Sequence, residues 1–287
     1  MYTILKNYRQ DKALRDSFNA LAEKTFGLNF EGWYKNGFWG DNYNPYSVVI
    51  DGEVAANVSL NRTDMLIDGE RKCIYQLGTV MTEEKYRNQG MIRAIMEEIE
   101  KDTADADGVY LFANDTVVEF YPKFGFRKGT EYLYNRKIEQ TGECEFENIP
   151  MKNHDDWAVL AKAMEETCVH SGCDMVKNPG LIFFYVSQFM QECVYYCKRL
   201  DTYVVAEIED GSLLLHNVFS KQAVALDEVI RAFGGRIKEV TLGFAPADDT
   251  GFEKTELHED DCTFFVKGAV FNDFEEKHLR IPSLSHT

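Results

Sequence analysis

The pattern of apolar and polar positions predicts that helices and strands alternate in the first half of the chain. Apolar residues recur at helical spacing within residues 11–30, which predicts an amphipathic helix. The β-prone runs 47–50 and 54–60 flank Asp51 and Gly52, a dipeptide that supplies the positive φ values of a two-residue hairpin turn. Three further elements are predicted after this hairpin: a strand at 72–81, a helix that begins at Met91, and a strand at 109–113.

The second half repeats this order of elements with a weaker pattern. It predicts helices at 157–164, 181–197 and 223–233, and strands at 203–208, 213–218, 240–244 and 262–266. Two copies of one α+β unit would explain the repetition. We therefore expect two domains, residues 1–142 and 150–287, with residues 143–150 as the linker.

Length and charge narrow the classes of function. A chain of 287 residues corresponds to about two domains at roughly 150 residues each. Acidic residues exceed basic ones by 48 to 31, and the net charge of −17 disfavours binding to nucleic acid or to an anionic membrane. Residues 1–140 carry −4 and residues 141–287 carry −13, so the first half is better suited to an anionic cofactor.

The cysteines and the N-terminus indicate a reducing compartment. Seven cysteines occur without C-x-x-C spacing, and the first ten residues contain no apolar segment typical of a secretory signal. We therefore predict reduced thiols and a cytoplasmic protein. The apolar stretch 181–196 is interrupted by Gln188, Gln191 and Glu192, so we interpret it as a buried helix and not as a membrane span.

Candidate chemistry lies at residues 78–100, where a strand ends and a helix begins directly after a basic loop. The loop has the sequence Arg87-Asn88-Gln89-Gly90-Met91-Ile92-Arg93. A helix N-terminus offers free N–H groups and the positive end of the dipole. Gly90 would let the backbone approach a bulky anion, and the amides of residues 88–92 could then bind a pyrophosphate. Taken alone, the same pattern also fits a loop glycine before a helix with solvated arginines.

Residues 114–126 favour the pyrophosphate-binding loop over a loop glycine with solvated arginines. Asn114 comes directly after the strand at 109–113, and Tyr121 begins a Tyr-x-x-x-Gly-Phe motif that ends at Phe126. This ordered set of elements, over residues 48–127, resembles the GNAT superfamily of acyl-CoA-dependent N-acyltransferases. The resemblance implies acetyl-CoA as co-substrate and an α+β fold with a mixed, mostly antiparallel sheet flanked by helices.

The resemblance also assigns roles to individual residues. The strand before the loop would separate from its neighbour at a bulge, where backbone groups of Val80 and Thr82 would pair with the pantetheine arm. The Thr82 amide would face the thioester carbonyl and stabilise the oxyanion, and Asn114 would face the pantetheine. The pyrophosphate loop would comprise Arg87, Asn88, Gln89, Gly90, Met91 and Ile92, with Arg93 next to it. Ile92 departs from the family pattern, which usually has Gly or Ala there.

Tyr121 lies where the family commonly has a tyrosine near the departing sulfur. A phenol with a pKa of about 10 is protonated at neutral pH and can donate its proton to a thiolate. The alternative is a core aromatic beside Phe120 and Phe124.

The sequence does not identify the general base that would take the proton of the acceptor amine. Four carboxylates lie in segments that could border the acceptor site, although a solvated surface charge is the favoured interpretation of each: Glu31, Asp41, Glu83 and Glu84. Cys73 is interpreted as a buried thiol.

The tandem arrangement with Arg-x-x-Gly-Met-Ile-Arg is similar to the bacterial "enhanced intracellular survival" type of acetyltransferase, which has two fused GNAT folds. In that type only the first fold binds acetyl-CoA, and a sterol-carrier-like domain follows the second fold. The present sequence stops before such a domain, at Thr287. The terminal carboxylate serves as base there, and the role of Thr287 is left open, since the segment that delivers this carboxylate in the relatives is absent from the present sequence. The second half contains neither hallmark motif, and we expect it to be a degenerate copy that does not bind coenzyme A.

Other clusters favour structural roles. His258 lies in an acidic run without a second pair of ligands, and Cys168 and Cys173 stand alone, so no metal site is predicted. Aromatic residues crowd the loop at 32–46 and could form core packing or a wall of the acceptor pocket.

These observations lead to one function and one alternative. We expect an N-acetyltransferase that moves the acetyl group of acetyl-CoA to a primary amine by direct attack, with Tyr121 as acid. The negative charge favours a small cationic molecule or a lysine side chain as acceptor, and a homo-oligomer is compatible with the sequence. The alternative is an acyl-CoA-binding sensor or scaffold without catalysis.

Overall fold

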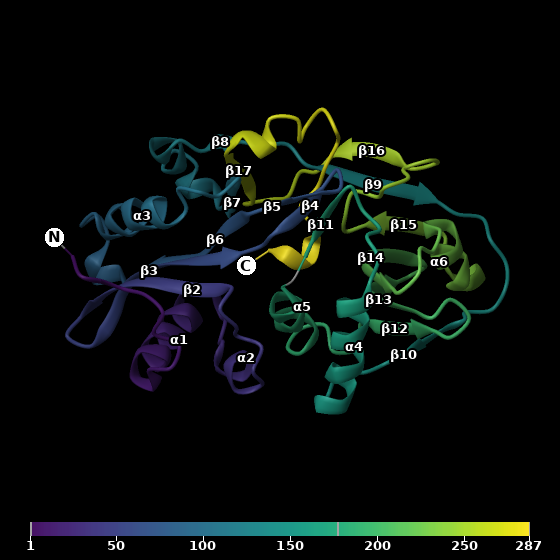
Figure 1. The fold of residues 1–287 in the computed structure, drawn as a ribbon, viewed down its shortest axis with the longest axis horizontal. Helices are drawn as coiled ribbons and strands as arrows, with labels where there is room; N and C mark the ends of the chain where they lie inside the picture. Colours follow the sequence, from purple (N-terminus) through teal and green to yellow (C-terminus); the bar gives the residue numbers. More distant parts are fainter. Residues whose placement is uncertain (1, 177, 287) are drawn as a thin grey trace.

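The computed structural model describes residues 2–176 and 178–286, and it contains two large mixed sheets in two adjoining lobes (Figure 1). The first sheet has the order β1 (Ile4–Leu5), β2 (Tyr43–Ile50), β3 (Glu53–Arg62), β6 (Ile74–Thr82), β7 (Gly108–Ala113), β17 (Thr263–Lys267) and β8 (Arg127–Lys128). The second has the order β10 (Phe146–Asn148), β12 (Val194–Cys197), β13 (Thr202–Glu209), β14 (Ser212–Ser220), β15 (Glu239–Leu242), β9 (Tyr132–Lys137) and β16 (Glu253–Glu256). A small sheet joins β11 (Cys173–Met175), β4 (Met65–Ile67) and β5 (Glu70–Lys72).

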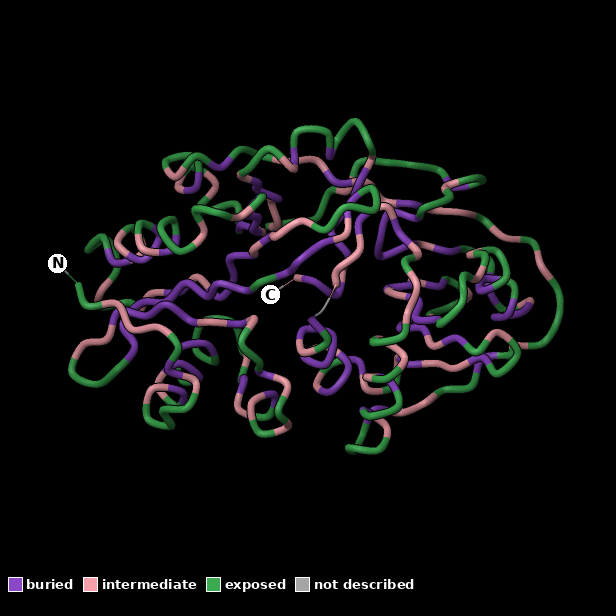
Figure 2. Tube along the Cα trace, viewed as in Figure 1, coloured by how far each residue is buried: buried purple, intermediate pink, exposed green. Residues whose placement is uncertain are grey.

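Helices flank both large sheets, as predicted for an α+β fold. They are α1 (Lys12–Phe26), α2 (Glu31–Lys35), α3 (Met91–Asp102), α4 (His154–Glu166), α5 (Pro179–Val186) and α6 (Leu226–Ala232). In the first lobe, α1 and α2 lie on one side of the sheet and α3 on the other (Figure 1). Figure 2 shows the consequence for burial, because the strand centres are buried and the outer helix faces are exposed. No helix among the described residues combines the length and apolar character needed to cross a membrane.

Several local predictions are confirmed. Asp51 and Gly52 have φ values of 53° and 83° and connect β2 to β3. The first helix begins after Asp11, whose carboxylate accepts hydrogen bonds from two backbone N–H groups, and it ends at Gly27 in the left-handed conformation. The predicted strand and helix around the basic loop are β6 and α3.

The predicted helix at 181–197 is wrong in its second part. Helix α5 ends at Val186, and residues 194–197 form β12, which pairs with both β10 and β13. The two outer residues of β12 are buried and the two inner ones are half-buried. Cross-strand pairing therefore decided the structure of this apolar segment, which periodicity alone could not distinguish from a buried helix.

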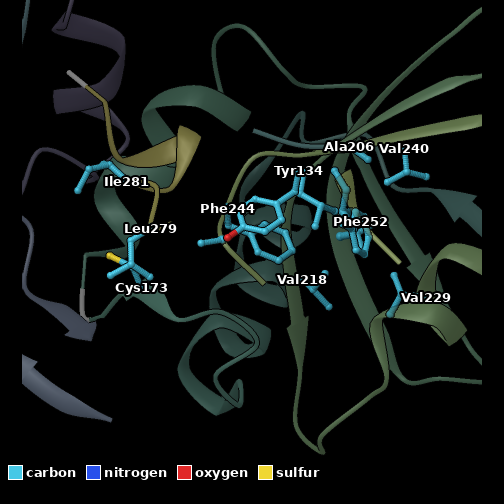
Figure 3. Packing of buried hydrophobic residues seen from close by; sticks show 14 of the residues in the cluster. Tyr134, Cys173, Ala206, Val218, Val229, Val240, Phe244, Phe252, Leu279 and Ile281 are labelled. Carbon is cyan, nitrogen blue, oxygen red and sulfur yellow. The ribbon is translucent and has the colours of Figure 1, made fainter. Parts of the chain in front are cut away.

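The two halves exchange strands. β17 lies between β7 and β8 of the first sheet, and β9 lies between β15 and β16 of the second. The division between the sheets therefore does not coincide with the predicted division at residues 142 and 150. Figure 3 shows Tyr134, from β9, among buried residues of the second core such as Phe244 and Phe252.

Candidate active site

A cleft opens in the first sheet because two parallel strands separate. β6 and β7 pair only from Ile74 with Gly108 to Leu77 with Leu111, and β6 then continues to Thr82 without this neighbour. On its other edge β6 contains a bulge, since Gly78 lies opposite Ser59 while Met81 lies opposite Asn57. This is the separation that the GNAT resemblance implies.

Buried side chains hold the bulge in a strained conformation. Thr79 has φ of 47°, which is rare for a β-branched residue. Its carbonyl accepts a hydrogen bond from Asn57 Nδ2 at 2.9 Å, and its hydroxyl lies 2.5 Å from the Tyr43 hydroxyl. Ser47 Oγ donates to Asn57 Oδ1 at 2.8 Å. Burial raises the pKa of Tyr43 to about 12, so this network stays neutral at physiological pH.

The cleft has a volume of about 780 Å³, and all residues predicted to bind the cofactor or to act as acid or oxyanion donor line it. Its lining includes Val80, Thr82, Arg87, Asn88, Gln89, Gly90, Met91, Ile92, Arg93, Asn114 and Tyr121. These residues come from the end of β6, the basic loop, the start of α3, the position directly after β7 and the short helix that begins at Tyr121. The geometry brings them together, while their individual roles stay predictions.

The basic loop presents unused backbone donors. Asn88 and Gly90 have φ values of 61° and 79°, and Gly90 is the N-cap of α3. In the part of the chain that the structure describes, no N–H group of residues 88–92 donates to a protein acceptor. Ile92, the departure from the family pattern, packs partly buried against the core under α3. A larger residue at this position therefore leaves the loop amides free.

The charge of the cleft is positive although the protein is strongly acidic. Arg87, Arg93 and Lys123 line it, and its described lining contains no Asp, Glu or His. The four predicted base candidates lie elsewhere: Glu31 pairs with Arg15, Asp41 with Arg9, Glu83 with Lys24, and Glu84 is exposed on the surface. The Lys24 ammonium, 2.6 Å from Glu83, lowers the pKa of that carboxyl.

Tyr121 is both a core aromatic and a cleft residue. It begins the short helix η3 (Tyr121–Phe124), is 4% exposed, and packs against Phe120, Phe126 and Phe265. Burial raises the pKa of its hydroxyl to about 12. The interpretations of Tyr121 as a core aromatic and as a proton donor are therefore compatible. The ring is packed in the core but also lines the cleft, and its hydroxyl retains its proton.

The second half contributes a residue that sequence reasoning missed. Asn114 Nδ2 donates to Asp261 Oδ2 at 2.8 Å, and the Asp115 amide donates to Asp261 Oδ1 at 2.6 Å. The Asn114 side chain thus binds Asp261 in addition to lining the cleft. Nothing in the sequence could distinguish Asp261 from the other carboxylates of its acidic run.

The C-terminal segment reaches the back of the cleft. Tyr110 Oη donates to the Ser285 carbonyl at 2.8 Å, and the His286 ring stacks on Phe112 with centroids 3.9 Å apart. Phe112 itself lines the cleft. Thr287, the predicted carrier of a terminal carboxylate, lies outside the described residues.

The aromatic loop serves mainly as core. Trp33, Trp39 and Tyr43 are each 3% exposed and pack with α5, where Phe30 stacks on Phe184. A separate pocket of about 360 Å³ lies between this loop and helices α4 and α5. The loop therefore joins the two halves as well as forming a pocket wall.

The separated parallel strands, the bulge and the basic loop are the features that the GNAT resemblance implies for the first sheet. Residues 11–129 match the model of the acetyltransferase (GNAT) domain family, in agreement with the resemblance found in the sequence. The predicted class of enzyme is thereby confirmed. No curated protein matches the sequence significantly.

Solved structures share the fold over nearly the whole chain. A conserved protein of unknown function from Enterococcus faecalis V583, a probable N-acyltransferase, is similar with a TM-score of 0.61 and 14% identity, over 96% of this chain and 75% of that one. A GCN5-related N-acetyltransferase from Kribbella flavida has a TM-score of 0.56 and 16% identity, over 92% of this chain and 71% of that one. Eis1 from Mycobacterium abscessus has a TM-score of 0.56 and 13% identity, over 91% of this chain and 73% of that one. The predicted tandem GNAT fold is therefore confirmed.

Proposed function

We propose that the protein is an acetyl-CoA-dependent N-acetyltransferase that acetylates a primary amine by direct attack. The observation that carries this proposal is the cleft beside β6, where free loop amides and three cations meet a gap between two strands. Coenzyme A fits both parts of this cleft, because its extended pantetheine arm matches the gap between the strands and its pyrophosphate matches the free amides and cations. The similarity to N-acetyltransferases supports an amine as acceptor.

The residues of the cleft would hold acetyl-CoA in a defined orientation. The N–H groups of residues 88–92, at the N-terminus of α3, would bind the pyrophosphate together with Arg87. Backbone groups of Val80 and Thr82 would bind the pantetheine arm. Acetyl-CoA supplies the activated acetyl group as a thioester. The Thr82 amide would stabilise negative charge that develops on the carbonyl oxygen.

Tyr121 would supply the proton for the leaving thiolate. Because burial raises its pKa to about 12, the hydroxyl is protonated at neutral pH and is available as a donor. The acceptor amine must lose one proton before or during attack, and the described lining of the cleft offers no carboxylate for this step. We propose that the proton leaves through water or a group outside this lining.

The acceptor is proposed to be a cation, either a small amine or a lysine side chain. Net charge supports this choice, because residues 141–287, which form most of the second sheet, carry −13. The alternative, an acyl-CoA sensor without turnover, is favoured by one observation, the absence of an acidic or histidine side chain from the described cleft lining.

Release of free thiol from acetyl-CoA in the presence of a panel of amines tests the proposal. We expect amine-dependent release, which falls by about 10²- to 10⁴-fold in Tyr121→Phe while coenzyme A binding and thermal stability are retained. Tyr196→Phe, in the second sheet, is the matched control and should behave as wild type. Acetyl-CoA binding without amine-dependent release would establish the sensor instead, and full activity of Tyr121→Phe would remove Tyr121 as the acid.

A further inference from the structure

The three cations of the cleft form two groups. Arg87 lies in the loop before α3, whereas Arg93 and Lys123 lie where the first turn of α3 faces η3. The Arg93 guanidinium carbon is 5.7 Å from the centroid of the Phe124 ring, so its side chain extends across to η3. Arg93 and Lys123 are both exposed. One rim of the cleft therefore carries two cations from different elements.

No carboxylate neutralises this rim. Among the described residues, neither Arg93 nor Lys123 forms an ion pair, although lysines and arginines elsewhere in this acidic chain commonly do. Two cations on the lining of one cleft, without a carboxylate partner, favour an anion there. The rim is therefore matched to a negatively charged group of a ligand that enters the cleft.

That group is separate from the pyrophosphate. The free amides of residues 88–92 and Arg87 already provide donors and charge for a pyrophosphate at the helix N-terminus. Coenzyme A carries one further anion, a 3′-phosphomonoester on its ribose, with close to two negative charges at neutral pH. A lysine ammonium is a compact point charge suited to such a group, and Arg93 follows the loop amides directly in the chain.

Resting on the proposed function, we propose that Lys123, supported by Arg93, binds the 3′-phosphate of coenzyme A and makes the cleft selective for coenzyme A over 3′-dephospho-coenzyme A. Lys123 is then a specificity residue for the cofactor and takes no part in the transfer of the acetyl group. Its role is visible in binding without any turnover.

Isothermal titration of the full chain with coenzyme A and with 3′-dephospho-coenzyme A tests this proposal. We expect wild type to bind coenzyme A about tenfold more tightly, the effect of one charge-assisted contact. Lys123→Met should lower the affinity for coenzyme A to that for the dephospho form, whose own affinity should not change. Lys123→Arg should retain part of the preference.

The control is Lys162→Met, an exposed lysine on α4 that should leave both affinities unchanged. Equal wild-type affinities for the two ligands, or equal weakening of both by Lys123→Met in a protein with unchanged circular dichroism, would overturn the assignment of Lys123 and leave the acetyltransferase proposal standing. Failure of wild type to bind either ligand would overturn both proposals.

Discussion

The two sheets have the same order and orientation of strands, yet only the first has the cleft and loop of a cofactor site. Each contains one parallel pair joined by a helix, β6–α3–β7 in the first and β14–α6–β15 in the second. Each also receives one strand from the other half, antiparallel to the second strand of that pair. The common topology supports the predicted duplication and places the functional difference in local features.

The bulge itself is not the difference, because the second sheet also has one. Asn217 lies opposite Val205 and Leu215 opposite Ala206, so His216 is the extra residue of β14. Its ring bonds Glu207 Oε1 and Ser283 Oγ, each at 2.8 Å.

The C-terminal segment fills the corresponding opening of the second sheet. A Cβ added to Gly243, just beyond β15, would lie 2.4 Å from Ser283 Oγ. The helix that follows β14 also differs from α3, because α6 has Asp227 and Glu228 in its first turn and no left-handed residue at its N-cap. Acidic side chains at that end disfavour an anion. The bulge is therefore a feature of the fold that both sheets share, whereas the basic loop and the open gap between parallel strands occur, among the described residues, only at the candidate site.

The network around the first bulge should matter for both stability and binding. Asn57→Ala removes the donor to the Thr79 carbonyl and leaves buried partners unsatisfied, so we expect a loss of about 3 kcal/mol in the free energy of unfolding. Because the bulge forms the cleft wall, the affinity for coenzyme A should fall as well. Urea unfolding and calorimetric titration measure the two effects. Stable protein with unchanged affinity would show that the cleft does not depend on this bulge.

Substitution of Gly90 can show whether its left-handed backbone conformation matters for ligand binding as well as for stability. Gly90→Ala and Gly52→Ala each put a Cβ on a backbone with φ near 80° and no atom within 4 Å, so each should cost about 1 kcal/mol of stability. Only Gly90→Ala should also weaken coenzyme A binding, by about tenfold, because it distorts the loop amides. Equal binding by both variants would mean that the conformation of Gly90 is not needed for the ligand.

His216 should give the second sheet a pH dependence. Burial is the main cause that lowers the pKa of His216, against the opposing effect of Glu207 and together with the charge of Arg280. The unfolded chain therefore takes up a proton below about pH 6.5 that the folded chain resists, and stability falls as the pH decreases through this range.

The variant His216→Gln isolates this contribution. It lacks the titrating group, so the difference in unfolding free energy between wild type and variant should shrink as the pH falls below about 6.5. His258→Gln, at an exposed histidine, is the control and should follow the wild-type curve. Parallel curves for wild type and His216→Gln would contradict this account of the second bulge.

Local features of the site were predictable from the sequence, and long-range pairings were not. Gly90 before Met91 marks a helix start, and the spacing to Tyr121 identifies the family, because both depend on neighbours in the chain. The exchange of β9 and β17 could not be predicted, since alternation identifies a strand but not its partner. Asp261 beside Asn114 depends on that exchange and was missed for the same reason.

A crystal structure of the protein with coenzyme A tests the central claim most directly, that only the first of two similar folds binds the cofactor. We expect one coenzyme A per chain, with its pantetheine arm between β6 and β7 and its pyrophosphate on the amides of residues 88–92. Coenzyme A bound between β14 and β15, or away from the basic loop, would contradict it.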